Sequence, residues 1–329
     1  IPAILFYVAL FIQADLEAAK GNMEKIEESK IPAAVTVLKS GWFFPLTFIA
    51  LVVALFVFNY SPELSALTAA AVVILATGTF GYKGKRLKFG DLFNALRGTG
   101  LGVIDIFMIG GCVGMVIGVL NLSGLGFALT LVLVQAAAGN LIILLVLAAI
   151  VCIILGMGMP TVGVYVLLAT LVAPALVEVG VVPIAAHLFI LYFGMMSMIT
   201  PPVAIGAFAA ATLTGADPMR TGFSAMRFGW LAFVIPFMFV ASPTLIMQGD
   251  VGFIIIDALG ALAAAWLISV GMIGFYSQPL SALERLAYGL AGIGLIIPLN
   301  AFAGANEANI VGLILAIGLL SLEVRRRKT

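Results

Sequence analysis

The chain has 329 residues and a formal net charge of +1 at pH 7, with 63% hydrophobic and 9% charged residues and a mean hydropathy of +1.24. Apolar runs long enough to cross a bilayer recur along its length, so the sequence predicts an all-α polytopic membrane protein. The balanced charge gives no support for a nucleic-acid partner. With one histidine and few intramembrane carboxylates, the chain lacks the clustered acids, bases and nucleophiles of an enzyme, so we expect no catalytic residues.

The first third is predicted to hold spans and basic loops. Residues 1–12 (IPAILFYVALFI) have no initiator Met, basic n-region or cleavage site, so we expect the end of a truncated span. Residues 13–41 carry acids and lysines at helical spacing, which favours a cytoplasmic or interfacial connector. Residues 42–97 contain two spans, at 42–59 and 62–82, followed by a basic loop that the positive-inside rule places in the cytoplasm.

The region 98–228 contains the longest tract without Lys or Arg, from Gly98 to Met219. Residues 98–120 are predicted to cross outward, and 124–138 are too short for a comfortable span, which indicates a tilted or interfacial segment. The next segments are 140–180 and 185–213.

The number of crossings constrains these two segments. Arg220 and Arg227 mark the loop 215–227 as cytoplasmic, so an even number of crossings separates it from Arg97. A re-entrant hairpin at 140–180 and a broken helix at 185–213 satisfy this count, and two full spans at 140–180 also satisfy it. Within the loop, Asp217 and Pro218 are predicted to be the N-cap and first residue of a helix.

The last region, 229–329, is predicted to hold C-terminal spans and a basic tail. The expected spans are 229–247, 251–276, 286–303 and 309–322. Counting them places the C-terminus, with its RRRK cluster, in the cytoplasm.

The sequence GMGMPT interrupts the hairpin segment and predicts an ion-binding tip. Gly156 and Gly158 allow close backbone approach, Pro160 removes a hydrogen-bond donor, and Thr161 supplies a hydroxyl at a helix start. Unwound carbonyls here, including that of Met159, suit Na⁺, and the helix N-terminus suits an anionic group. The alternative is an ordinary Gly/Pro turn.

The sequence SMITPP interrupts the next helix. Two successive prolines remove two donors, so we expect a break at which the Ser197 and Thr200 hydroxyls lie beside freed carbonyls of Met198 and Ile199. This neutral oxygen set is of the kind that holds Na⁺ in transporters, and the alternative is a structural kink. We expect the substrate to bind at the same two breaks, at Pro160, Thr161, Pro201 and Pro202.

The remaining polar candidates have simpler explanations. His187 lies among apolar residues, where a hydrogen-bonded structural histidine is more common than a proton carrier. Asp105 and Glu178 fall near predicted span ends, where water is close. Cys112 and Cys152 lie in apolar runs without metal-ligand spacing, so we expect small buried residues.

The segment from GMGMPTVGVY through MSMITPPVAIG to LTGADPMRTGFSAMRFG resembles the large membrane subunit of tripartite ATP-independent periplasmic (TRAP) transporters. Within that family it is similar to the fused permeases that partner TAXI-type binding proteins. The terminal stretch PLSALERLAYGLAGIGLIIP fits the same resemblance. The resemblance covers effectively the whole chain.

The resemblance implies an elevator-type sodium symporter of the cell inner membrane, built from two inverted repeats that each contain a re-entrant hairpin and a broken helix. It implies no cofactor besides the coupling Na⁺, and a small, carboxylate-bearing substrate delivered by a periplasmic TAXI-type binding protein. The hairpin 140–180 and the break at Ser197 to Pro202 would form one Na⁺ site. We expect the first repeat and the fused small subunit to lie upstream of Ile1.

Three other functions stay open from the sequence. A channel is expected to show rings of charge or repeated filter carbonyls, which this chain lacks. A binding-protein-independent sodium symporter of similar hairpin architecture, or a membrane scaffold subunit without transport, would share the same composition.

Overall fold

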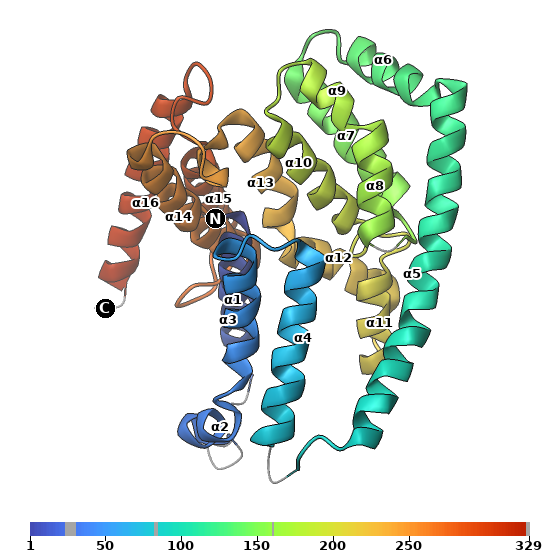
Figure 1. The fold of residues 1–329 in the computed structure, drawn as a ribbon. Coiled ribbons are helices and arrows are strands. Elements are labelled where there is room, and N and C mark those ends of the chain that lie inside the picture. Colours follow the sequence, from blue (N-terminus) through green and yellow to red (C-terminus); the bar gives the residue numbers. More distant parts are fainter. Residues whose placement is uncertain (24–30, 82–84, 160, 327–329) are drawn as a thin grey trace. The chain divides into compact units, whose positions relative to one another are not determined.

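The computed structural model describes residues 1–23, 31–81, 85–159 and 161–326 (Figure 1). These residues are almost entirely helical and contain no strand, and an isolated bridge joins Phe275 and Pro279. The all-α prediction is therefore confirmed. The chain forms two compact units, residues 24–108 and residues 1–23 with 109–329, and α5 (Phe89–Ser123) runs across their boundary.

The unit 24–108 is built on an antiparallel helix pair. It contains α2 (Ala34–Gly41), α3 (Phe44–Phe56) and α4 (Pro62–Thr79) before the start of α5. The α3 and α4 helices pack against each other, and α2 and α3 meet at a 59° bend. The Ser61 hydroxyl caps α4 by accepting a hydrogen bond from the Leu64 amide, as expected for Ser before Pro at a helix start.

In the larger unit, α1 (Pro2–Lys20) continues past Ile12, where the sequence analysis placed the end of a span. Its polar last turns are used for contacts. The Gln13 side-chain amide donates to the Phe228 carbonyl at 2.8 Å, and Lys20 Nζ donates to the Ile273 carbonyl at 2.7 Å. The polar residues that suggested a solvated connector therefore hold α1 to the ends of other helices.

The central helices are short and apolar. They are α6 (Leu125–Ala137), α7 (Leu141–Gly156), α8 (Thr161–Leu171), α9 (Ala173–Glu178), α10 (Pro183–Met196) and α11 (Ile205–Thr214). The Asn140 side chain caps α7 by accepting from the Ile142 and Ile143 amides. None of these helices reaches the 18 residues of a candidate span. Each is therefore too short to cross a bilayer by itself.

The C-terminal helices include the longest apolar segments of this unit. They are α12 (Pro218–Phe228), α13 (Trp230–Ala241), the short 3₁₀ helix η2 (Pro243–Ile246), α14 (Val251–Ile273), α15 (Ala282–Ile296) and α16 (Ala305–Arg326). The predicted cap of α12 is confirmed, since Asp217 accepts a hydrogen bond from the Arg220 amide at 2.8 Å and Pro218 begins the helix. The α15 helix packs against both α14 and α16.

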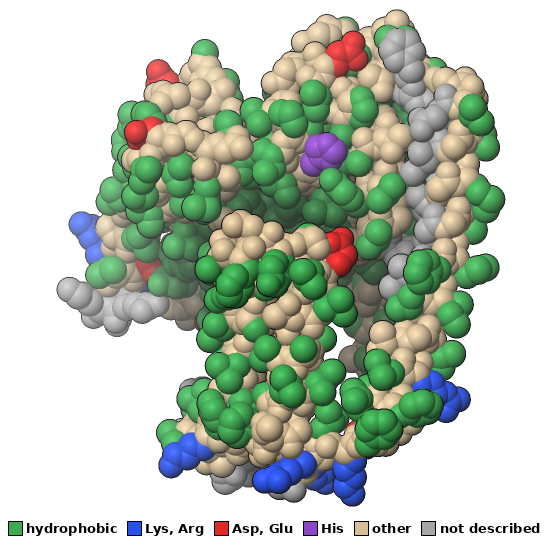
Figure 2. Space-filling model, viewed as in Figure 1, with side chains coloured by type: hydrophobic (Ala, Val, Ile, Leu, Met, Phe, Trp, Pro, Cys, Tyr) green, Lys and Arg blue, Asp and Glu red, His purple; other side chains and the backbone are tan. Residues whose placement is uncertain are grey.

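Length and composition support several membrane crossings. The described residues contain five helices long and apolar enough to cross a bilayer, and the bent pair α2–α3 makes up to six. The five are 2–20, 62–79, 218–241, 251–273 and 305–326. Hydrophobic side chains also cover much of the face in Figure 2, where the few Lys and Arg side chains lie at its edges. The chain is therefore a multi-pass membrane protein.

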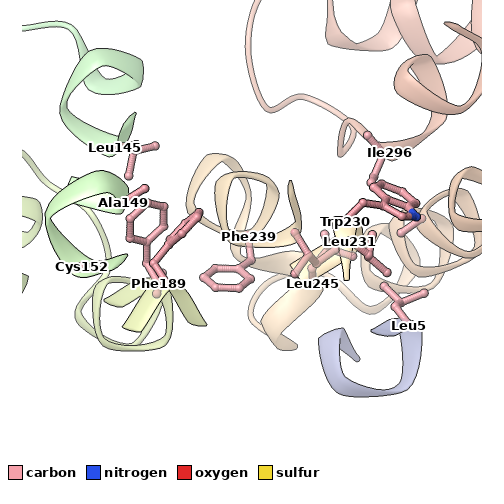
Figure 3. Close-up of a cluster of buried hydrophobic side chains, with 14 of the residues drawn as sticks. Leu5, Leu145, Ala149, Cys152, Phe189, Trp230, Leu231, Phe239, Leu245 and Ile296 are labelled. Atoms are coloured by element: carbon pink, nitrogen blue, oxygen red, sulfur yellow. The ribbon is translucent and has the colours of Figure 1, made fainter. Parts of the chain in front are cut away.

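One apolar core runs through the larger unit, from Cys152 of α7 through Phe189 of α10 to Phe239 of α13 and Leu245 of η2 (Figure 3). All four side chains are fully buried. The prediction of burial is thus confirmed for Cys152. It is wrong for Cys112, which lies exposed on α5.

Candidate functional site: the hairpin tip and the helix break

The GMGMPT sequence separates two helices, as predicted: α7 ends at Gly156 and α8 begins at Thr161. The Met159 amide approaches the Gly156 carbonyl at 3.5 Å, which closes a tight turn. Gly158 has φ +76°, a conformation that glycine adopts without the steric cost of a side chain. Gly158 and Thr161 are exposed and Met159 is half-buried, while Pro160 lies outside the described residues.

The SMITPP sequence likewise ends one helix and precedes another. The α10 helix ends at Met196 and α11 begins at Ile205. The Ser197 hydroxyl donates to the Gly194 carbonyl at 2.7 Å, and the Thr200 hydroxyl donates to the Met196 carbonyl at 2.7 Å. Each hydroxyl uses its proton in this contact and keeps oxygen lone pairs for another partner.

Two carbonyls of the break were expected to be free. The Met198 carbonyl accepts a hydrogen bond from the Gly206 amide at 2.9 Å, so it is not free, because the start of α11 folds back over it. No backbone amide in the described part of the chain donates to the Ile199 carbonyl. The break therefore offers the Ile199 carbonyl and the Ser197 and Thr200 hydroxyls, whereas Met198 has only its second lone pair.

The base of the hairpin tip contacts the end of α10. A methyl group built on Gly156 would lie 2.6 Å from the Gly194 carbonyl oxygen and 3.0 Å from the Ser197 hydroxyl oxygen. A methyl built on Gly194 would in turn lie 2.5 Å from a methyl of Val164, in the first turn of α8. Only glycine at 156 and 194 allows this approach, so both helices of the hairpin meet α10 one turn before the break.

The structure does not bring every predicted residue into this contact. A side-chain carbon at Gly158 would meet nothing within 4 Å, and Thr161 is exposed. No hydrogen bond joins the Thr161 and Thr200 hydroxyls within the described ranges. The contact between tip and break therefore rests on Gly156 and Ser197.

The α12 helix supports the break from another side. A methyl group built on Gly222 would lie 2.8 Å from the Pro201 ring, and one built on Gly229 would lie 2.8 Å from the Ile199 side chain. Pro202 is exposed. The cytoplasmic helix expected after Asp217 is thus also a packing partner of the break, a role that the sequence did not indicate.

The isolated polar residues take structural positions. His187 Nδ1 lies 3.1 Å from the Tyr165 hydroxyl, a hydrogen bond that joins α10 to α8, as expected for a structural histidine. Glu178 is exposed at the end of α9, and the Asp105 side chain lies outside the described part of the chain. No group of three or more metal-ligating side chains occurs among the described residues.

One buried acid was missed by the sequence analysis. Asp257, 5% exposed in α14, accepts hydrogen bonds from the Thr244 hydroxyl at 2.6 Å and the Leu299 amide at 2.8 Å. The Thr244 hydroxyl also lies 3.1 Å from that of Ser242. A lone acid within the apolar run 251–276 was the available signal, but its partners lie on other segments. With both carboxylate oxygens bonded, Asp257 links η2 to the turn that follows α15.

A comparison with protein families decides the assignment. Residues 1–252 match the family of the tripartite ATP-independent periplasmic transporter, DctM component. The chain belongs to this family. The resemblance to the TRAP large membrane subunit is therefore confirmed. The short apolar helices of this chain belong to a transporter permease. No curated protein and no solved structure matches the chain significantly.

Family membership also indicates the kinds of protein with which such a large component works. Large components of TRAP transporters work with a periplasmic binding protein and a small membrane subunit. The matched residues contain both the hairpin tip and the helix break, whereas most of α14 and all of α15 and α16 follow the match.

Proposed function

We propose that this DctM-family permease couples Na⁺ entry to the import of a small, carboxylate-bearing solute, and that the ion binds between the hairpin tip and the helix break. The observation that carries the proposal is the contact of Gly156 with Gly194 and Ser197. It places two interrupted helices against each other, and interrupted helices form the ion and substrate sites of many secondary transporters.

The oxygen atoms at the break suit a monovalent cation. The Ser197 and Thr200 hydroxyls keep lone pairs after donating to α10, and the Ile199 carbonyl adds a third oxygen. The C-terminal end of α10 contributes partial negative charge at the same place. We propose that the tip completes the site with oxygens of Gly156, Gly158, Met159 and Thr161.

The substrate proposal rests on the helix starts. The α8 helix begins at Thr161 and α11 begins at Ile205, so each directs the positive end of its dipole toward an interruption. A carboxylate is stabilised at such ends without a basic side chain. We propose that the solute lies beside Thr161, Pro160, Pro201 and Pro202.

The proposal includes the partners and orientation. A periplasmic TAXI-type protein would deliver the solute, and the first repeat with a fused small subunit would complete the inner-membrane permease. The C-terminus would be cytoplasmic, since Arg325 and Arg326 end the last candidate span. Uptake that needs no binding protein would instead favour the independent symporter.

The experiment is Na⁺-dependent solute uptake by the complete permease with its binding protein in proteoliposomes. Thr200→Ala and Thr161→Ala each delete one oxygen without adding charge or bulk. Losing one ligand costs about 1–3 kcal/mol, so the Na⁺ concentration for half-maximal uptake should rise roughly 5- to 150-fold. The limiting rate should fall less.

Thr170→Ala is the matched control, because the Thr170 hydroxyl also donates to a carbonyl four residues earlier in α8. It should leave the Na⁺ dependence unchanged. If Thr200→Ala and Thr161→Ala behave like this control at normal expression, the interruptions are hinges and ion coupling resides elsewhere.

A further inference from the structure

A surface groove runs between α14 and α15, beyond the residues that match the transporter family. Its volume is about 450 Å³, within the size of small-molecule sites. The apolar walls come from Ile268, Met272, Leu286, Leu290 and Ile293. The permease mechanism proposed above does not use this groove.

Two glycines shape the groove. A methyl group built on Gly271 would lie 2.8 Å from the Arg285 carbonyl and 3.2 Å from the Gly289 amide, so α14 and α15 are in backbone contact there. A methyl on Gly289 would meet nothing within 4 Å. The missing side chain at Gly289 therefore leaves an open depression beside the crossing point.

Of the residues that line the groove, Arg285 is the basic one, and it lies at the end of the groove. Arg285 is exposed, and its Nε and Nη2 atoms donate to the Gly271 and Met272 carbonyls at 3.0 Å each. These bonds fix the guanidinium at the C-terminal end of α14. Its three other N–H groups are available to an acceptor.

The Arg285 charge has no acidic partner among the described side chains. The adjacent Glu284 is paired with Arg326 and also accepts from the Ser281 amide and hydroxyl. The groove thus combines an apolar wall with one fixed, unneutralised cation at its end.

We propose that this groove binds an anionic phospholipid, with the phosphate on Arg285 and an acyl chain along Gly289, Leu290 and Ile293. The 23 residues of α14 span a bilayer, so the last carbonyls of α14, which Arg285 contacts, lie at headgroup depth. Basic pockets between membrane helices at this depth bind anionic headgroups. Charge complementarity favours a lipid over a two-fold-related second copy of the chain, which would bring its own Arg285 to the same interface.

Native mass spectrometry of the intact permease, titrated with phosphatidylglycerol or phosphatidylcholine, tests the proposal. Wild type should bind phosphatidylglycerol more tightly. Arg285→Gln should weaken phosphatidylglycerol binding roughly five-fold and remove most of the preference. Gly289→Leu keeps the charge and fills the depression, so it should weaken binding by displacing the acyl chain.

Two variants serve as matched controls. Arg220→Gln removes an exposed positive charge on α12, and Gly318→Leu adds the same side chain at a glycine of α16 that also faces open space. Neither should change lipid binding. Equal affinity for both lipids, or Gly289→Leu matching Gly318→Leu, would overturn the proposal. So would groove variants that alter dimer content but not lipid binding, because the occupant would then be a second copy.

Discussion

Gly156→Ala tests whether the close contact between hairpin and broken helix is required. The added methyl would lie 2.6 Å from the Gly194 carbonyl oxygen, whereas ordinary contact begins at 3.4 Å. The two helices must therefore separate by about 0.8 Å, the difference between these distances. Because the opposing atom is backbone, no side-chain rotation relieves the clash.

The expected cost follows from overpacking of a well-packed interior, about 1–3 kcal/mol. The equilibrium between folded and unfolded permease should shift roughly 5- to 150-fold toward unfolding. Denaturant titration in mixed micelles measures this change. The separation also moves Gly156 away from the Ser197 hydroxyl, so half-maximal uptake should require more Na⁺ if the proposed ion site is correct.

Gly318→Ala is the control, because a methyl at this helical glycine meets no atom within 4 Å. Replacing Gly by Ala within a helix should leave stability unchanged or raise it by up to about 1 kcal/mol. Equal stability of Gly156→Ala and Gly318→Ala would refute the argument, since it would mean that the hairpin does not press on α10.

Three further predictions concern other parts of the larger unit. Asp257→Ala should lower stability by about 1–3 kcal/mol in thermal unfolding, because it removes the acceptor of both the Thr244 hydroxyl and the Leu299 amide. Hydrogen bonds from the Ser281 amide and hydroxyl, with Arg326 nearby, lower the pKa of Glu284, so its stabilising effect exists above its unfolded pKa and is lost as pH falls through the folded pKa. Glu284→Gln should remove that acid-side loss in unfolding scans. Cysteines at the exposed positions Asn140 and Glu178 should both react with an impermeant thiol reagent from outside, and labelling of one from the cytoplasm alone would exclude the hairpin.

Local chemistry made several features predictable from the sequence. The glycines and prolines at 156–161 and 197–202 interrupt helices through their own backbone geometry, independently of tertiary contacts. Both interruptions could therefore be predicted from the sequence. The cap at Asp217 is also local, since its partner is the Arg220 amide three residues later. The same motifs carried the family resemblance.

Contacts between distant segments could not be predicted in this way. Predicting the contact between Gly156 and Gly194 requires knowing how α10 packs against α7. The spacing of glycines along the sequence does not give that packing. The Met198 carbonyl was expected to be free because its partner, Gly206, lies beyond an irregular turn. Asp257 was overlooked because its donors, Thr244 and Leu299, come from two other segments.

The contacts around α10 bear on the elevator-type motion that the resemblance to TRAP permeases implies. The α10 helix meets α13 through aromatic rings, with Phe189 and Phe237 centroids 5.5 Å apart, and no hydrogen bond joins these two helices in the described residues. In contrast, α1 holds the end of α12 through the Gln13 bond to the Phe228 carbonyl and an ion pair between Glu17 and Arg227. Sliding apolar rings past one another leaves no buried polar group without a partner, whereas breaking the Gln13 bond would. We therefore expect the interface of α10 with α13 to slide more easily than the interface of α1 with α12.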